Sequence, residues 1–282
     1  DRIKPISLVD VIPFLRFLLP KPIKLSGIIY KIYLRAPKTG IRNLIDRFRY
    51  TVMAKSGSMG KVFILNDPQS AERLNQIYNS DRFMTLADPV PEVKGEVYDL
   101  RPKLGIPQES NVYLHFGAMD ERKGTLEILH ALNLMTPQEL DGRTFIFAGR
   151  VNKSIKDHFC RLVDMLRKQG ASIIVRDEFC TYEFLHSLCN TSDYILMPYI
   201  LTDLSSGVLG YAATYGKPVI GPDSGLIGEL ITDNGLGLAI DISPESLKEA
   251  ILCPQIYSSE SGARKYIARN TRERFIEDFL GS

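Results

Sequence analysis

The chain has 282 residues, of which 44% are hydrophobic and 24% charged, a composition ordinary for a globular protein with one large domain or two smaller ones. Its net charge of +2 is unevenly distributed, because residues 1–56 carry twelve Lys or Arg and only three Asp. The longest apolar stretch, residues 9–19, is interrupted by Asp10, Pro13 and Arg16, so it is too short and too polar to span a bilayer.

The first sixty residues form basic, amphipathic pieces that are expected to end at Pro13, Pro20, Pro22 and Pro37. Residues 1–56 carry a net charge of +9 and the remainder −7, which predicts a surface that meets something anionic. One interpretation is a peripheral contact with anionic lipid headgroups, and the other is a solvated basic surface whose acidic partners precede this chain. Basic and aromatic residues follow no recognised nucleic-acid module, so no nucleic acid partner is predicted.

A strand–helix–strand pattern follows at Lys61–Leu65, Gln69–Asn79 and Phe83–Leu86. Residues 1–90 are too few for a complete doubly wound domain and resemble the last third of one. Residues 91–108 are rich in proline and lack apolar periodicity, which predicts a linker. Because the chain begins at Asp1 without a signal-peptide pattern, we expect a fragment of a longer protein.

Residues 109–256 alternate between apolar strand-like runs and helical patterns, which predicts a Rossmann-like domain with a parallel sheet covered by helices on both faces. The expected strands are Val112–Phe116, Thr144–Ala148, Ser172–Val175, Tyr194–Met197, Pro218–Ile220 and Gly237–Ile240. The expected helices are Thr125–Leu134, Ser154–Gln169, Tyr182–Cys189, Ser206–Tyr215 and Pro244–Leu252. Within residues 257–282, the segment Ser259–Leu280 has a helical pattern and is expected to pack outside the sheet.

Residues 194–229 place a helix start at the carboxyl end of a strand. Three small residues, Ser205, Ser206 and Gly207, open this helix. Unpaired N–H groups and the positive end of the helix dipole attract anions there, and small residues let a phosphate approach the backbone. The segment therefore predicts a phosphorylated ligand in a crevice of an open α/β sheet.

Three further loops follow parallel strands. Gly117 permits a tight turn after the first strand, from which Lys123 can reach a phosphate. Arg150 follows the second strand and suits bidentate phosphate contact. Each of these loops alone is equally compatible with a solvated surface. Because all of them lie at the same edge of the sheet, together they predict a phosphate or nucleotide site. The loop after the third strand can clasp a base and contributes Arg176, Glu178 and Phe179, and the fourth loop adds Asp203 and the amides of Ser205, Ser206 and Gly207.

The four cysteines, Cys160, Cys180, Cys189 and Cys253, contain no CxxC pair and no regular spacing. This favours reduced, buried thiols in a cytoplasmic protein. His158 lies near Cys160 and His186 near Cys189, but the spacings do not support a metal site.

These loops resemble those of the donor-binding C-terminal domain of GT-B glycosyltransferases of family 4, also called group 1. The resemblance covers about residues 108–280 and is carried by GAMDERKG at Gly117–Gly124, FAGR at Phe147–Arg150 and YGKPVIGPDSGLIGELI at Tyr215–Ile231. LNDPQSAERLNQIY and LADPVP resemble the end of the N-terminal, acceptor-side domain. The resemblance implies a GT-B fold, a Rossmann-like nucleotide-sugar domain at residues 109–256, and a tail helix that packs back toward the N-terminal domain.

Several positions depart from the family pattern. Ala118 stands where the family has arginine, so the diphosphate would depend on Lys123, with Arg150. The two glutamates of the E-x7-E motif correspond to Asp203, which can still accept hydrogen bonds from the donor sugar, and to Tyr211, which cannot act as a carboxylate toward the ribose. Glu229 matches a family glutamate. No D-x-D motif occurs, as expected for a metal-independent GT-B enzyme.

The resemblance implies a retaining hexosyltransferase-type enzyme in which Lys123 and Asp203 are the catalytic candidates. It implies transfer from a nucleotide diphosphate sugar to a glycan or lipid-linked acceptor in polysaccharide biosynthesis, with no further cofactor. We expect a cytoplasmic protein at the inner face of the membrane. The alternatives are a non-catalytic GT-B-like protein that binds a nucleotide sugar or a partner, and a sugar-nucleotide epimerase of GT-B shape.

Overall fold

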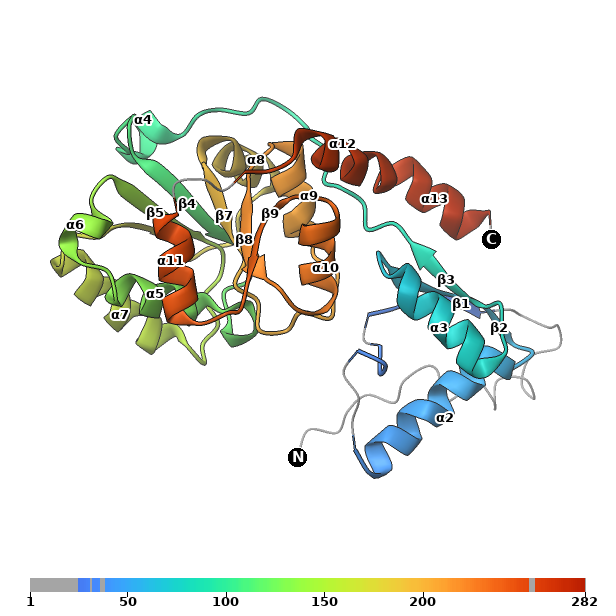
Figure 1. The fold of residues 1–282 in the computed structure, drawn as a ribbon. Helices are drawn as coiled ribbons and strands as arrows, with labels where there is room; N and C mark the ends of the chain where they lie inside the picture. The colour runs from blue at the N-terminus through green and yellow to red at the C-terminus, as the bar shows by residue number, and fades with distance from the viewer. Residues whose placement is uncertain (1–24, 31, 36–38, 254–256, 282) are drawn as a thin grey trace. The chain divides into compact units, whose positions relative to one another are not determined.

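The computed structural model describes residues 25–30, 32–35, 39–253 and 257–281, which form two compact units (Figure 1). The first unit comprises residues 1–88, 203–205 and 272–282, and the second comprises residues 89–202 and 206–271. Pro13, Pro20, Pro22 and Pro37, where the basic pieces were predicted to end, lie outside the described residues. Within the described part of the chain, no helix is long and apolar enough to cross a bilayer.

The first unit contains a parallel sheet in the order β1-β2-β3. The prediction of a strand, a helix and a strand in residues 61–86 is confirmed, whereas the first strand and the first helix of this unit were not predicted as such. Its strands are β1 (Leu25–Ile29), β2 (Met59–Leu65) and β3 (Phe83–Leu86), and its helices are α2 (Ile41–Lys55), α3 (Pro68–Tyr78) and α13 (Arg272–Leu280).

Alternate residues of β2 face the two sides of this sheet. Val62 and Ile64 are buried in a core with α2 and α3, while the ring of Phe63 lies 5.1 Å from that of Phe279 in α13. Asp67 caps α3 by accepting a hydrogen bond from Ser70 N at 3.0 Å.

The second unit contains a six-stranded parallel sheet in the order β6-β5-β4-β7-β8-β9, so the strand order reverses between β4 and β7. The six predicted strands are confirmed, with ends shifted by at most two residues. The strands are β4 (Asn111–Phe116), β5 (Arg143–Ala148), β6 (Ser172–Arg176), β7 (Tyr194–Leu196), β8 (Val219–Pro222) and β9 (Gly237–Ile240).

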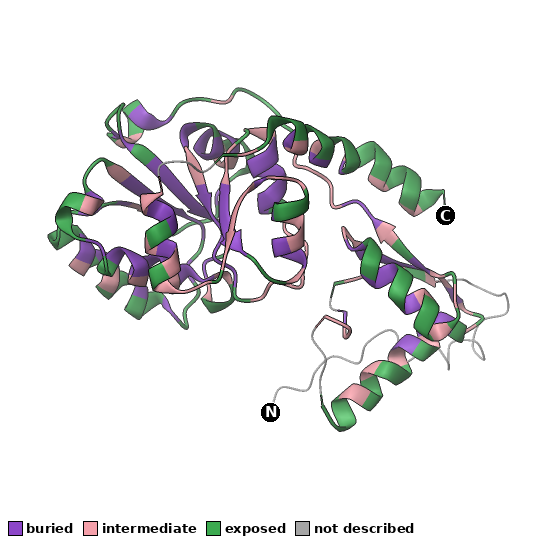
Figure 2. Ribbon diagram, in the orientation of Figure 1, coloured by how far each residue is buried: buried purple, intermediate pink, exposed green. Residues whose placement is uncertain are grey.

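Helices cover both faces of this sheet, which confirms the doubly wound α/β prediction (Figures 1 and 2). One core lies under α5 (Thr125–Asn133), α7 (Lys156–Lys168) and α11 (Pro244–Leu252). The other lies under α8 (Tyr182–Thr191), α9 (Gly207–Thr214), α10 (Gly225–Asp233) and α12 (Glu260–Arg269). The short helices are α4 (Arg101–Leu104), η1 (Glu121–Lys123) and α6 (Pro137–Leu140).

Three expectations need correction. Helix α10 was not predicted, and the C-terminal segment is two helices that are separated at residues 270–271. Cys160 is exposed, so the prediction of buried thiols is wrong for this cysteine, although Cys180 and Cys189 are buried.

Candidate functional site

The candidate site lies at the carboxyl ends of the second unit's strands, beside the point where the strand order reverses between β4 and β7. After β4, Asp120 caps the single turn η1 by accepting a hydrogen bond from Lys123 N at 3.1 Å. This turn brings the Lys123 ammonium back against the end of the strand. Lys123 Nζ donates a hydrogen bond to the Tyr199 hydroxyl at 2.8 Å and lies 4.8 Å from the centre of that ring.

Tyr199 connects the lysine to the start of α9. It is buried just beyond β7, and its hydroxyl lies 3.5 Å from Ser206 Oγ. Ser206 is the N-cap of α9 and accepts a hydrogen bond from Val208 N at 3.4 Å. The ammonium and two hydroxyl groups therefore form a chain that ends at the N-terminus of α9, where Gly207 is exposed. A positive charge and the positive end of a helix dipole at one place can bind an anion.

Two close backbone approaches hold the strand ends together. Gly124, at φ 64°, faces the end of β7, and a β-carbon there would lie 1.8 Å from the Pro198 carbonyl oxygen. Gly149 follows β5 at φ 140°, and a β-carbon there would lie 1.9 Å from the Gly117 carbonyl oxygen. Any side chain at these positions would push apart the loops that position Lys123.

His115 fixes the same strand ends from inside the core. Its ring is 1% exposed, and Nδ1 donates to the Leu196 carbonyl at 2.9 Å, while Nε2 lies 3.0 Å from Thr125 Oγ1. Because a carbonyl can only accept, Nδ1 carries the proton and Nε2 accepts from the threonine. Burial lowers the pKa of His115 to about 4, and the charge of Lys123 acts in the same direction.

This shift predicts that the protein loses stability as the pH falls from 6.5 toward 4. In that window the unfolded chain gains a proton on His115 that the folded protein excludes, so the stabilisation is complete above pH 6.5. The expected loss is at most about 3.4 kcal/mol. In urea unfolding across this pH range, the free energy of unfolding of His115→Gln should depend less steeply on pH than that of the parent.

The matched control for this measurement is His158→Gln, which changes an exposed histidine and should keep the parental pH dependence. Burial also lowers the pKa of His186, so the slope of the His115→Gln variant should shrink without vanishing. A slope as steep as the parent's would contradict the assignment of a neutral, buried His115.

The loops after β5 and β6 lie at the same sheet edge and are joined by Asp177, which the sequence did not single out. Its carboxylate accepts hydrogen bonds from Val151 N and Lys156 Nζ at 2.8 Å and 2.7 Å. The hydrogen bond from Lys156 is the largest factor that lowers the pKa of Asp177. The predicted residues of these loops are exposed, namely Arg150, Arg176, Glu178 and Phe179.

The structure does not place every candidate beside Lys123. Asp203 and Ser205 belong to the short segment that clusters with the first unit. There the Ser205 hydroxyl donates to Asp88 at 2.6 Å and accepts from Asn66 at 3.2 Å. Glu229 is partly buried on α10. The assignment of these three predicted residues to a donor remains a prediction.

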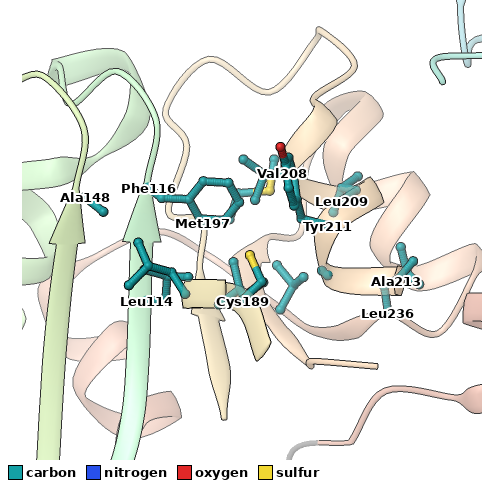
Figure 3. Packing of buried hydrophobic residues seen from close by; sticks show 14 of the residues in the cluster. Leu114, Phe116, Ala148, Cys189, Met197, Val208, Leu209, Tyr211, Ala213 and Leu236 are labelled. Atoms are coloured by element: carbon teal, nitrogen blue, oxygen red, sulfur yellow. The ribbon is translucent and has the colours of Figure 1, made fainter. Parts of the chain in front are cut away.

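Tyr211 lies within the apolar core rather than on the exposed edge (Figure 3). Its side chain is 5% exposed, and its ring packs edge-on against Phe116 at 5.4 Å and lies 4.9 Å from the ring of His186. The Tyr211 hydroxyl has no hydrogen-bond partner among the described residues, and burial raises its pKa. Contact between this hydroxyl and a ligand remains a prediction.

Comparisons with known proteins give a family and a fold. Residues 97–274 match the model of the family described as glycosyl transferases group 1. No curated protein sequence matches the chain. Within the described residues, no three His, Cys, Asp or Glu side chains are grouped so that they could hold a metal ion.

Three solved structures illustrate the shared fold. WaaG, a glycosyltransferase involved in lipopolysaccharide biosynthesis, is 17% identical to this chain with a TM-score of 0.65. The match covers 100% of this chain and 86% of WaaG. Anabaena HepE in complex with UDP-glucose is 16% identical, with a TM-score of 0.65 over 92% of this chain and 71% of its own. The trehalose-6-phosphate synthase OtsA is 12% identical, with a TM-score of 0.69 over 97% and 69%.

Proposed function

The chain belongs to the glycosyl transferases of group 1, and we propose that it moves a hexose from a nucleotide diphosphate sugar to a glycan or lipid-linked acceptor, with retention at the anomeric carbon and without a metal ion. In this proposal residues 109–256 bind the donor, and residues 1–90 are the end of the acceptor-side domain. Lys123 and Asp203 are the proposed catalytic residues.

The observation that carries the proposal is the position of the Lys123 ammonium, 2.8 Å from the Tyr199 hydroxyl and next to the capped start of α9. When the bond between the sugar and the diphosphate breaks, negative charge develops on the departing diphosphate. An ammonium group and the positive end of the α9 dipole that are already in place stabilise that charge without further reorganisation. The exposed Arg150 at the same sheet edge is the second proposed contact to the diphosphate.

The names of the structural relatives guide the choice of substrates. HepE is solved with UDP-glucose, so a uridine diphosphate sugar is the first donor to test. WaaG is described as acting in lipopolysaccharide biosynthesis, which supports a lipid-linked glycan as acceptor and a role in polysaccharide biosynthesis. We further propose a cytoplasmic protein that contacts the inner face of the membrane through basic residues within residues 1–56.

A thermal-shift series with UDP, GDP, ADP and their sugars tests the donor site. A nucleotide at about one hundred times its Kd should stabilise the fold by about 2.7 kcal/mol, and Lys123→Ala should reduce that shift. If no nucleotide raises the Tm, the proposed donor site is wrong. If a nucleotide sugar binds but no donor hydrolysis or transfer follows, the result favours a non-catalytic binding protein.

A further inference from the structure

Helix α2 of the first unit has apolar residues on two opposite faces. One face, with Tyr50, Met53 and Ala54, is buried against the sheet. The other face carries apolar side chains that are exposed along the first two turns. These are Ile41, Leu44, Ile45 and Phe48, with exposed fractions of 76%, 65%, 45% and 63%.

These four residues, which we call the α2 stripe, form a continuous surface rather than scattered exposed positions. Their spacing of i, i+3, i+4 and i+7 places them on one side of a helix. Single exposed apolar residues are common in folded proteins, but a contiguous apolar surface usually marks a contact site. The α2 stripe therefore needs an occupant other than the core of its own unit.

Positive charge lies along both sides of the α2 stripe. At about 100° per residue, Arg42 and Arg49 project on one side of the stripe, and Arg47 projects on the other. Asp46, the single acidic residue in the sequence of α2, lies on the face opposite the stripe, and its carboxylate is 3.9 Å from the Arg49 guanidinium. An apolar strip with cations on both sides is the arrangement of a helix that lies in the interface of an anionic bilayer.

We propose that α2 is the membrane-docking element of this protein, with the α2 stripe inserted among the acyl chains of an anionic bilayer and Arg42 and Arg47 bound to lipid phosphates. The inference rests on the proposed membrane contact of residues 1–56 and assigns it to one helix. A bilayer fits better than a protein partner, because cations on both sides of the stripe match a surface that is anionic on both sides of an inserted helix.

Vesicle flotation with the full chain tests the apolar part of this contact. The parent should bind vesicles of phosphatidylcholine mixed with phosphatidylglycerol, and the double variant Ile45→Ser, Phe48→Ser should bind at least about tenfold more weakly, which is about 1.4 kcal/mol. Ile77→Ser is the matched control, because Ile77 is a 47% exposed isoleucine on α3 of the same unit. Arg42→Gln with Arg47→Gln should also weaken binding and reduce its sensitivity to salt.

A fluorescence reporter separates insertion from simple attraction. The chain contains no tryptophan, so Phe48→Trp introduces a single indole at the C-terminal end of the α2 stripe. Its emission should shift to the blue when phosphatidylglycerol vesicles are added, and should stay unchanged with phosphatidylcholine alone. Binding of the anionic vesicles without a blue shift, or equal binding by the parent and the double serine variant, would overturn the inference.

Nucleotide binding distinguishes this inference from the proposed function. If the parent fails to bind anionic vesicles but is stabilised by a nucleotide sugar, the bilayer is the wrong occupant of the α2 stripe, and a protein partner takes its place. If the vesicles bind through α2 but no nucleotide stabilises the fold, the docking helix stands and the transferase proposal fails.

Discussion

Lys123→Ala is expected to lower kcat/KM for sugar transfer by about 10²–10³-fold, the usual cost of removing one group that stabilises charge in a transition state. The Lys123 ammonium lies beside Tyr199 and the N-terminus of α9, where the departing diphosphate is proposed to bind. Lys123 is only partly buried, so its truncation should change the free energy of unfolding little. The measurement is steady-state transfer with the nucleotide sugar that gives the largest thermal shift.

Two further variants make this result specific. Lys168→Ala removes an exposed lysine from the last turn of α7 and should keep the parental kcat/KM. Lys123→Arg keeps the positive charge but replaces the compact ammonium with a planar guanidinium group. Its activity should therefore fall between those of the parent and Lys123→Ala. If Lys123→Ala keeps the parental activity, Lys123 is not the main contact to the diphosphate.

The architecture of the second unit could be predicted because its central strands are buried on both faces. Such strands appear in a sequence as short, continuous apolar runs, and the helices between them have their own period. Helix α10 was missed because Pro222, Gly225 and Gly228 read as a loop. In the structure, Gly225 and Gly228 instead lie where the helix packs closely on the backbone near Thr202 and Asp223.

The site could be predicted only in part, because its contacts join residues that are distant in the sequence. Lys123 and its partner Tyr199 are 76 residues apart, and the tyrosine has no motif of its own. The sequence could have indicated Tyr199 only by its position directly after Pro198, at the end of a predicted strand. The role of His115 depends on two neighbours from different elements, so spacing along the chain could not show it.

Helix α2 illustrates a different limit. An amphipathic helix is recognised in a sequence by a single apolar face. This helix has two apolar faces, one in the core and one in solvent. The sequence indicated basic, amphipathic pieces in this region, but the structure was needed to separate the two faces.

Gly149→Ala is expected to lower the stability of the second unit by about 3 kcal/mol. A residue with a β-carbon at φ 140° costs about 1–3 kcal/mol, and overpacking adds about 1–3 kcal/mol. Here the β-carbon would lie 1.9 Å from the Gly117 carbonyl oxygen, a backbone atom that cannot rotate away. Relief of the overlap would separate the ends of β4 and β5, where Gly117 N donates to the Ala148 carbonyl at 2.9 Å. Thermal unfolding should show a Tm lower by roughly 6–12 °C.

Gly170→Ala provides the control for this prediction, because Gly170 also has a positive φ of 96°, but a β-carbon added there would meet no atom within 4 Å. It should show only the cost of the backbone conformation, so the difference between the two variants measures the overlap with Gly117. Since the turn at Gly117 positions Lys123, Gly149→Ala should also weaken nucleotide binding at temperatures where the protein remains folded. Equal Tm values for the two variants would mean that β4 and β5 can separate at little cost, and the rigid placement of the lysine would then need another source.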